Sequence, residues 1–264
     1  MTASLLVTGG TGTIGRRTVP LLRDAGREVR VLSRHPRAAT PGVEQVAGDT
    51  VSGAGLEAAF AGVTTVLHLA GGAKGDDVAA RRVVAAASRA RVSHLVLISV
   101  IGADAMPIGY FRAKAEAERV IAGSDVPWTI LRVAQLHEFV LPVVRGMTRL
   151  PVLPVPGGLR FEPVHVDEVA ARLAELALGT PAGRAADLAG PEVLDVRQLA
   201  ERYAGAFGRA RRPALPIRIP GAVGRAYRTG ANLAHGPALR CQRTWADFAA
   251  GLAADAGAGA SVPA

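Results

Sequence analysis

Short apolar runs alternate with helical segments along the first two-thirds of the chain, and this alternation is the feature that most constrains the fold. Strand-like runs lie at residues 5–8, 28–33, 43–47, 63–70, 94–99 and 128–133. Helical patterns separate several of them, at residues 13–25, 56–60, 78–91 and 111–122. Because helical crossovers join parallel strands, this order predicts an α/β fold with a doubly wound parallel sheet covered on both faces. Ligands of such sheets bind beyond the carboxyl ends of the strands.

The pattern loosens in the last part of the chain. Helices are expected at residues 137–148, 167–178 and 196–207, whereas residues 209–240 are rich in Arg, Pro and Gly and have no clear assignment. We therefore expect a single domain over residues 1–255, with a sheet-containing core at about 1–136. A small, mostly helical C-terminal lobe would occupy about 137–255. Residues 256–264, mostly Ala and Gly, are expected to form a flexible tail.

Composition excludes several classes of protein. Of the 264 residues, 49% are apolar, which is ample for a packed core and excludes a disordered chain. The single cysteine, Cys241, excludes a disulfide scaffold and a cysteine-based zinc site, and the six histidines form no metal-binding motif. No apolar run reaches the roughly 18 residues of a membrane span, and no basic segment precedes the first apolar stretch. We expect a cytoplasmic protein without a metal and without a membrane partner.

The net charge of +9 does not predict nucleic-acid binding here. Only two of the 31 basic residues are lysines, Lys74 and Lys114, and the arginines are spread along the chain rather than gathered in one run. This indicates a general compositional bias. We expect a small-molecule substrate and no nucleic-acid partner; an oligomer is possible, but no feature of the sequence indicates one.

A glycine-rich segment, Thr8-Gly9-Gly10-Thr11-Gly12-Thr13-Ile14-Gly15, lies between the first predicted strand and the first predicted helix. Its glycines at positions 9, 12 and 15 leave room for a pyrophosphate to touch the backbone and let the helix pack closely on the strand. The helix N-terminus offers free N–H groups and the positive end of its dipole to the phosphates. A tight turn without a ligand is the alternative, but the flanking strand and helix are the context that dinucleotide binding requires.

The end of the second predicted strand indicates which dinucleotide is bound. Proteins that bind NAD place an acidic residue about 20 residues after the turn, to hold the ribose 2′-hydroxyl. This chain instead reads Val31-Leu32-Ser33-Arg34, and a hydroxyl and a guanidinium suit a 2′-phosphate. We expect NADP(H) in preference to NAD(H), unless Arg34 is only one of many surface arginines. Asp49 would bind the adenine amino group or, alternatively, cap a helix or turn.

A lysine lies in the helix predicted at residues 111–122, and a tyrosine lies four residues earlier, just before that helix. Tyr110 and Lys114 would share one helix face, where the ammonium would lower the pKa of the phenol and make it a usable acid. Ser99, at the carboxyl end of the fifth predicted strand, would hold a substrate oxygen against the phenol. The alternative is a half-buried tyrosine beside a solvated lysine.

Taken together, these segments resemble the short-chain dehydrogenase/reductase superfamily, in its extended or atypical branch close to the NmrA-like NAD(P)-binding proteins. The motifs that carry the resemblance are T-G-x-x-G-x-x-G at 8–15, His68-Leu69-Ala70-Gly71, Ser99, Tyr110-x-x-x-Lys114, Trp128-Thr129-Ile130-Leu131-Arg132 and Val164-His165-Val166-Asp167-Glu168-Val169-Ala170. The resemblance implies a Rossmann-type fold. It implies that Tyr110 is the acid/base, that Lys114 binds the nicotinamide ribose, that Ser99 orients the carbonyl, and that Ala70 and Gly71 line the cofactor.

The sequence thus predicts an NADPH-dependent oxidoreductase that transfers hydride to or from a small carbonyl, quinone or enone. A non-catalytic NADP(H)-binding sensor of the NmrA type and an epimerase or dehydratase with a retained cofactor are the alternatives. The predicted catalytic residues are Ser99, Tyr110 and Lys114. The predicted cofactor-binding residues are Thr8, Gly9, Thr11, Gly12, Thr13, Ile14, Gly15, Ser33, Arg34, Asp49, Ala70, Gly71 and Lys114.

Overall fold

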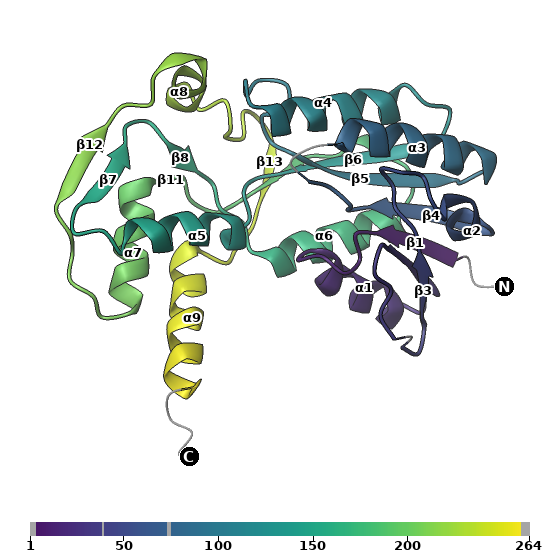
Figure 1. The fold of residues 1–264 in the computed structure, drawn as a ribbon, viewed down its shortest axis with the longest axis horizontal. Helices are drawn as coiled ribbons and strands as arrows, with labels where there is room; N and C mark the ends of the chain where they lie inside the picture. Colours follow the sequence, from purple (N-terminus) through teal and green to yellow (C-terminus); the bar gives the residue numbers. More distant parts are fainter. Residues whose placement is uncertain (1–3, 39, 73–74, 260–264) are drawn as a thin grey trace. The chain divides into compact units, whose positions relative to one another are not determined.

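The structure, a computed structural model, describes residues 4–38, 40–72 and 75–259. These residues form two compact units (Figure 1). The first unit comprises described residues within 4–104, 108–133 and 166–186, and the second comprises 105–107, 134–165 and 187–259. The division differs from the boundary expected at about residue 136, because the chain returns to the first unit for residues 166–186.

A parallel sheet forms the centre of the first unit. Its strands are β1 (Ser4–Thr8), β2 (Val29–Ser33), β3 (Val43–Ala47), β4 (Val63–His68), β5 (His94–Val100), β6 (Trp128–Val133) and β9 (Gly183–Arg184). Their order is β3-β2-β1-β4-β5-β6, with β9 beside β6, and all pairs are parallel. This is the strand order of dinucleotide-binding α/β proteins, in which the order reverses between β1 and β4. The expected α/β fold with a doubly wound parallel sheet is therefore confirmed.

Helices cover both faces of this sheet (Figure 1). They are α1 (Gly15–Asp24), α2 (Leu56–Phe60), α3 (Asp76–Arg89), α4 (Gly109–Ala122) and α6 (Val166–Leu178). Helices α3 and α4 pack against each other over one face, and α1 and α6 pack against each other over the other. Each crossover therefore returns the chain to the same edge, and the loops that follow the strands gather at their carboxyl ends.

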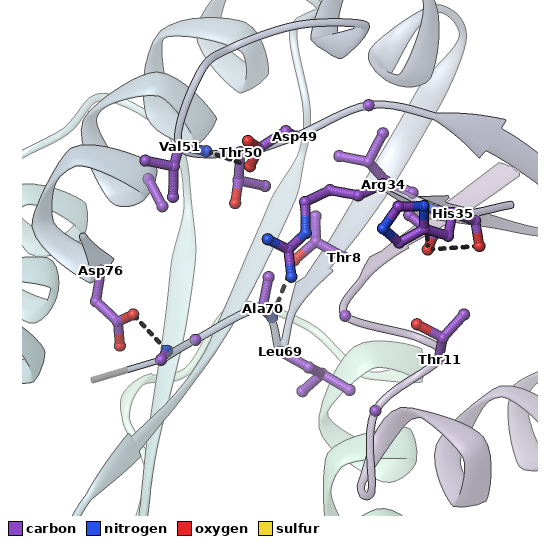
Figure 2. Close-up of a pocket in the computed structure, with 18 of the residues that line it drawn as sticks. Thr8, Thr11, Arg34, His35, Asp49, Thr50, Val51, Leu69, Ala70 and Asp76 are labelled. Carbon is purple, nitrogen blue, oxygen red and sulfur yellow. Dashed lines mark hydrogen bonds between the residues drawn. The ribbon is translucent and has the colours of Figure 1, made fainter. Parts of the chain in front are cut away.

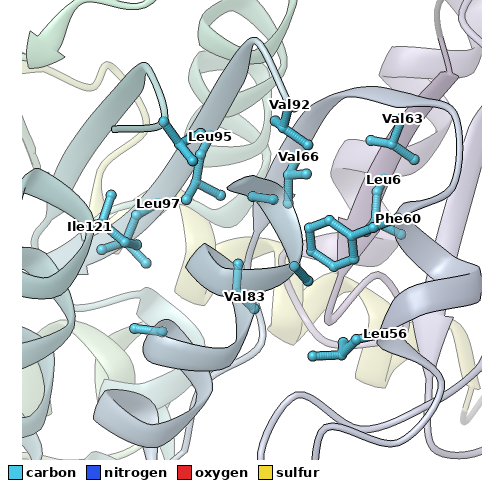
Figure 3. Close-up of a cluster of buried hydrophobic side chains, with 14 of the residues drawn as sticks. Leu6, Leu56, Phe60, Val63, Val66, Val83, Val92, Leu95, Leu97 and Ile121 are labelled. Atoms are coloured by element: carbon cyan, nitrogen blue, oxygen red, sulfur yellow. The ribbon is translucent and has the colours of Figure 1, made fainter. Parts of the chain in front are cut away.

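A buried apolar cluster joins the sheet to α2, α3 and α4 (Figure 3). Phe60 from α2, Val83 from α3 and Ile121 from α4 meet Leu6 and Leu95 of the strands, and each is at most 1% exposed. Burying one such side chain contributes on the order of 2 kcal/mol. The cluster thus fixes α3 and α4, which carry the candidate polar residues, against the sheet.

The second unit contains both helices and short strands, and the helices supply most of its regular secondary structure. Its helices are α5 (His137–Met147), α7 (Val196–Ala206), α8 (Gly221–Arg228) and α9 (Trp245–Gly259). Its strands are β7 (Leu153–Pro156), β8 (Arg160–Phe161), β10 (Asp187–Ala189), β11 (Leu194–Asp195), β12 (Ala214–Ile217) and β13 (Ala238–Arg240). Residues 209–240 thus supply two strands and α8. The sequence pattern did not indicate these elements, because the segment is rich in Arg, Pro and Gly.

A second core holds this unit together. The indole of Trp245 is buried and donates a 2.9 Å hydrogen bond to the carbonyl of Leu199. Helix α7 begins with a capping box, in which the Asp195 side chain and the Gln198 side chain each bond the other's backbone N–H. Helix α9 runs to Gly259, so residues 256–259 are helical rather than part of the expected tail, and residues 260–264 lie outside the described part. None of the helices within residues 4–259 that the structure describes is both long and apolar enough to cross a membrane.

Candidate cofactor and proton-transfer site

A cavity of about 570 Å³ opens at the carboxyl ends of β1, β2, β3 and β4 (Figure 2). It lies where the strand order reverses, and it belongs entirely to the first unit. Its lining residues are Thr8, Gly9, Thr11, Gly12, Leu32, Ser33, Arg34, His35, Arg37, Gly48, Asp49, Thr50, Val51, Leu69, Ala70, Gly71, Gly72, Asp76 and Ala79. This is the position at which open α/β sheets bind their ligands.

Glycine is required at both ends of the turn that follows β1. Gly9 has a left-handed φ of 72°, and a Cβ placed there would lie 2.6 Å from the backbone nitrogen of Ala70. A Cβ at Gly15, the first residue of α1, would lie 2.4 Å from the carbonyl oxygen of Gly9. At Gly12 a Cβ would meet only that same oxygen, at 3.2 Å, and would otherwise extend into open space. The turn thus forms a shallow cradle whose open side faces the cavity.

The end of β2 supplies two cations to the cavity. Arg34 and Arg37 are exposed, and neither guanidinium makes a hydrogen bond or ion pair with the residues that the structure describes. Figure 2 shows the Arg34 side chain extending across the cavity toward Thr8 and Ala70. The Ser33 hydroxyl accepts a 3.2 Å hydrogen bond from the N–H of His35. Unpaired guanidinium groups beside a hydroxyl are suited to a phosphate group.

Asp49 follows β3 and also lines the cavity. Its Oδ1 accepts a 2.9 Å hydrogen bond from the N–H of Val51, which closes a tight turn. This bond, together with further bonds from Ser52, lowers the pKa of Asp49. The two alternatives weighed from the sequence are therefore compatible: the side chain shapes a turn and still faces the cavity.

A buried hydrogen bond joins β1 to β4 at the reversal point. The Thr8 hydroxyl lies 2.6 Å from Nδ1 of His68 and accepts a longer bond, 3.3 Å, from the N–H of Ala70. Burial lowers the pKa of His68 to about 4, and the positive charge of Lys114 adds to this effect. A neutral imidazole therefore fixes the strand end from which Ala70 and Gly71 continue.

Lys114 is held by a carboxylate that the sequence analysis did not identify. Its Nζ lies 2.9 Å from Oδ2 of Asp76, and the two side chains are only 7% and 5% exposed. The other oxygen of Asp76 accepts a 2.9 Å hydrogen bond from the N–H of Gly72 (Figure 2). Asp76 and Gly71 line the cavity, whereas Lys114 lies behind them and does not.

Tyr110 and Lys114 do share one face of α4, as their spacing predicts, with Nζ 6.0 Å from the centroid of the phenol ring. The expected fall in the phenol pKa is wrong for this structure. Burial, together with the negative charge of Asp76, raises the pKa of Tyr110 to about 12. The ammonium is already neutralised by Asp76, so it does not compensate for the lost hydration of the phenolate.

Ser99 lies where it was expected, near the carboxyl end of β5. It is 5% exposed, and its hydroxyl oxygen makes no hydrogen bond within the described part of the chain. A buried hydroxyl without a partner is uncommon, because it loses its hydrogen bond to water. Ser99 itself does not line the cavity.

Helix α4 is anchored through a partly buried ion-pair network on the same face as Lys114. Both oxygens of Glu118 accept 2.7 Å hydrogen bonds from the guanidinium of Arg132 in β6, and Arg132 also bonds Asp104. A bidentate arginine–carboxylate pair has a fixed geometry. It therefore restrains α4 one turn after Lys114.

Most of the predicted cofactor residues line the cavity, but four do not. Those that do are Thr8, Gly9, Thr11, Gly12, Ser33, Arg34, Asp49, Ala70 and Gly71. Those that do not are Thr13, Ile14, Gly15 and Lys114. The sequence analysis missed Arg37, His35 and Asp76; the first two continue the polar segment after Ser33, whereas Asp76 resembles an ordinary acidic residue in the first turn of a helix.

Comparisons with known proteins agree with this geometry. Residues 9–174 match the family described as NAD(P)H-binding. A reductase of Streptomyces griseus, named (4-alkanoyl-5-oxo-2,5-dihydrofuran-3-yl)methyl phosphate reductase, is 32% identical over an alignment 260 residues long. The alignment spans 89% of this chain and 91% of the relative. The NAD(P)H azoreductase of Xenophilus azovorans is 28% identical over 78% of this chain and 74% of its own.

A solved structure has the same fold over nearly the whole chain. It is an NADPH-dependent quinone oxidoreductase of Escherichia coli, which superposes with a TM-score of 0.78 at 20% identity and covers 94% of this chain and 99% of that one. The strand order, the glycine turn and the family match are thus mutually consistent. This chain belongs to the NAD(P)H-binding family, in agreement with the NAD(P)-binding fold that its sequence motifs predict.

Proposed function

We propose that the protein is an NADPH-dependent reductase of a small conjugated carbonyl compound, such as an enone, an unsaturated lactone or a quinone. The cavity at the strand reversal carries this proposal. Its glycine cradle fits the pyrophosphate of NADPH, and its two arginines, which make no ion pair with the residues that the structure describes, fit the 2′-phosphate. The reductases among the relatives support it. The relative from Streptomyces griseus has a substrate that, by its name, carries carbonyl groups on an unsaturated ring.

The residues of the cavity fit the cofactor in three places. Gly9 and Gly12 would let the pyrophosphate approach the backbone at the start of α1, where helix N–H groups point outward. Arg34 and Arg37, with the Ser33 hydroxyl, would hold the 2′-phosphate that distinguishes NADPH from NADH. Asp49 would face the adenine ring. Ala70 and Gly71 would lie along the ribose and the nicotinamide.

The chain's own polar groups would then orient and protonate the substrate oxygen. When bound, the dinucleotide supplies the hydride. Tyr110, whose raised pKa keeps it protonated, would donate a proton to the reacting oxygen. The unpartnered Ser99 hydroxyl would bind the same oxygen and orient it. A phenol that is protonated throughout the neutral range favours the direction of reduction.

Calorimetric titration tests the cofactor assignment. We expect NADPH to bind with an affinity at least about tenfold above that of NADH, since a charge-assisted phosphate contact is worth about 1.5–3 kcal/mol. Tighter binding of NADH would contradict the roles given to Arg34 and Arg37. An absence of binding heat with both nucleotides would overturn the proposed function as a whole.

Tyr110→Phe tests the chemistry separately from binding. The variant should bind NADPH with nearly unchanged affinity but lose most of its turnover with a panel of quinones, enones and unsaturated lactones. Tyr203→Phe is the matched control, because that hydroxyl bonds Arg145 in the second unit. If the wild-type protein binds NADPH but oxidises it with no member of the panel, the sensor alternative replaces the reductase. Nicotinamide retained through purification without net consumption would favour an epimerase.

A further inference from the structure

Large apolar side chains are exposed mainly in the second unit, and most of them belong to two segments of that unit. Phe139 and Val143 of α5 are 64% and 55% exposed, and Leu215 of β12 is 55% exposed. The side chains that we call the apolar face are Phe139, Val143, Leu150, Val152, Leu215 and Ile217, each at least 40% exposed. A single exposed apolar residue is ordinary, whereas a group of them marks a surface that binds a partner.

Hydrogen bonds hold the two segments of the apolar face side by side. Nε of Arg212 donates a 3.2 Å bond to the carbonyl of Thr148, the residue that follows α5. The N–H of Leu153 donates a 2.8 Å bond to the carbonyl of Pro213. From there β7 and β12 run parallel to each other (Figure 1). The end of α5, residues 148–156 and residues 212–217 therefore belong to one region of the second unit.

Helix α5 presents one side to the core of its unit and another to solvent. Val140 and Val144 are buried in that core, whereas Phe139 and Val143, one position earlier in each turn, are exposed. Since side chains four residues apart share a helix face, the exposed pair forms an apolar stripe. The outer side of a surface helix ordinarily carries polar residues, so this stripe indicates a contact outside the second unit.

Arginines without acidic partners border the apolar face. The arginine rim consists of Arg149, Arg209, Arg211, Arg212 and Arg218, all of them exposed, and none forms an ion pair with a residue that the structure describes. Glu201 lines the same hollow as three of them, but it is already paired with Arg197 at 2.8 Å. Nine arginines and no acidic residue lie between Glu201 and Asp247. The unit therefore does not neutralise the charge of this rim itself.

The charge and the shape of this region decide among the candidate partners. A second copy that met the same face across a two-fold axis would bring two arginine rims together, and like charges repel. A nucleic acid would use the arginines, but single strands also need stacked aromatic rings, and the face contains only Phe139. Neither partner accounts for both the cations and the aliphatic side chains.

Addition of a peptide strand to β12 is opposed by proline. The carbonyls of Pro213 and Ile217 accept bonds from β7, so by alternation the backbone of Pro216 faces the free edge. Proline has no N–H to donate there, which blunts the edge. An anionic lipid surface, in contrast, fits both features, because its phosphates attract guanidinium groups and its acyl chains accept apolar side chains.

We propose that the apolar face and the arginine rim bind the second unit to the surface of a membrane that contains anionic phospholipids. The apolar side chains would enter the boundary between headgroups and acyl chains, and the rim would bind the lipid phosphates. The sequence predicts no membrane partner because no apolar run spans a bilayer, but a surface contact requires no such run. This inference goes beyond the proposed function and involves no residue of the cofactor cavity.

Sedimentation of the full-length protein with lipid vesicles tests the contact. Without nucleotide, the protein should bind vesicles of equal parts phosphatidylglycerol and phosphatidylcholine, and at least about tenfold more weakly vesicles of phosphatidylcholine alone. Raising the salt concentration from about 0.1 M to about 0.5 M should weaken binding to the anionic vesicles at least about fivefold, because salt screens the arginines. No binding to the anionic vesicles, or equal binding to both kinds, would overturn the proposal.

Two double variants separate the contributions of the face and the rim. Phe139→Ser with Leu215→Ser removes two exposed apolar side chains, and Arg211→Gln with Arg218→Gln removes two exposed charges. Each pair should weaken binding to the anionic vesicles at least about fivefold and leave the thermal unfolding temperature as in the wild type. Wild-type vesicle binding by either pair would contradict the proposal.

The matched control carries the same kinds of change on α1 in the first unit. Leu21→Ser with Arg16→Gln alters exposed positions and should retain wild-type vesicle binding. An equal loss in this control would assign the effect to overall charge and hydrophobicity and overturn the docking face. Since none of these measurements uses NADPH, failure of the membrane contact and failure of the reductase assignment give different results.

Two further measurements identify the other partners. In sedimentation equilibrium without lipid, a wild-type dimer that Phe139→Ser with Leu215→Ser converts to a monomer would assign the face to a second copy. Binding of soluble polyglutamate as tightly as anionic vesicles would assign the rim to an acidic protein. Either result would overturn the membrane contact, whereas we expect no such dimer and at least about tenfold weaker binding of polyglutamate.

Discussion

At the scale of single residues, the two arginines after β2 show what a sequence pattern captures and what it leaves out. Ser33 and Arg34 were identified because they stand where an acidic residue is expected in NAD-binding proteins. Arg37 lies outside that short pattern, yet it lines the same cavity. Charged groups near a phosphate act over several ångströms, so a loop rather than one position would set a preference for NADPH over NADH.

Arg34→Ala should weaken NADPH binding about tenfold or more and leave NADH binding within about twofold, since only NADPH carries the 2′-phosphate. Calorimetry with both nucleotides measures the difference. Arg89→Ala, at an exposed position at the end of α3, is the control and should change neither affinity. An equal loss for both nucleotides would place Arg34 on the pyrophosphate instead.

At the scale of elements, some glycines of the turn between β1 and α1 are required by the fold, and another leaves room for a ligand. Gly9 and Gly15 are fixed by contacts with the protein's own backbone, whereas Gly12 faces open space. The glycine spacing therefore combines two constraints. Gly9 and Gly15 allow close packing of the protein's own backbone, and Gly12 leaves open space for a ligand. Packing of α3 on α4 in the same unit created the Asp76–Lys114 pair, which no spacing within one helix could indicate.

Gly15→Ala should lower the free energy of unfolding by about 2 kcal/mol or more, since its Cβ would lie 2.4 Å from backbone atoms. Gly12→Ala should cost less than about 1 kcal/mol but weaken NADPH binding, because its Cβ points toward the cavity. Urea denaturation and calorimetry distinguish the two effects. Comparable losses of stability in both variants would refute this division of roles.

At the scale of the whole molecule, each unit contains a buried histidine whose pKa is lowered to about 4, which makes the protein sensitive to acid. Burial lowers the pKa of His68 in the first unit, and of His137 in the second, to about 4. The unfolded chain takes up these protons near the ordinary value of 6.5, whereas the folded chain resists them. The stability that these two neutral histidines contribute is therefore fully present above about pH 6.5 and is lost as the pH falls toward 4.

His137→Phe should reduce this loss. The ring would keep its contacts with Trp245 and Phe248 and would forfeit only a 3.2 Å hydrogen bond to the carbonyl of Pro163. Between neutral pH and pH 5, the unfolding free energy of the variant should fall by about 2 kcal/mol less than that of the wild type. Urea unfolding at both pH values measures it. His35→Gln, an exposed control, should not alter the pH dependence.

The sequence by itself determined the order of strands and helices over the first two-thirds of the chain, the glycine turn after β1 and the shared helix face of Tyr110 and Lys114. These features depend on backbone conformation and on periodicity within short segments, which neighbouring residues dictate. Only the tertiary structure decided that residues 166–186 return to the first unit, that Asp76 holds Lys114, and that the pKa of Tyr110 rises rather than falls. Burial and charge pairing depend on which distant segments meet, and no local pattern records that choice.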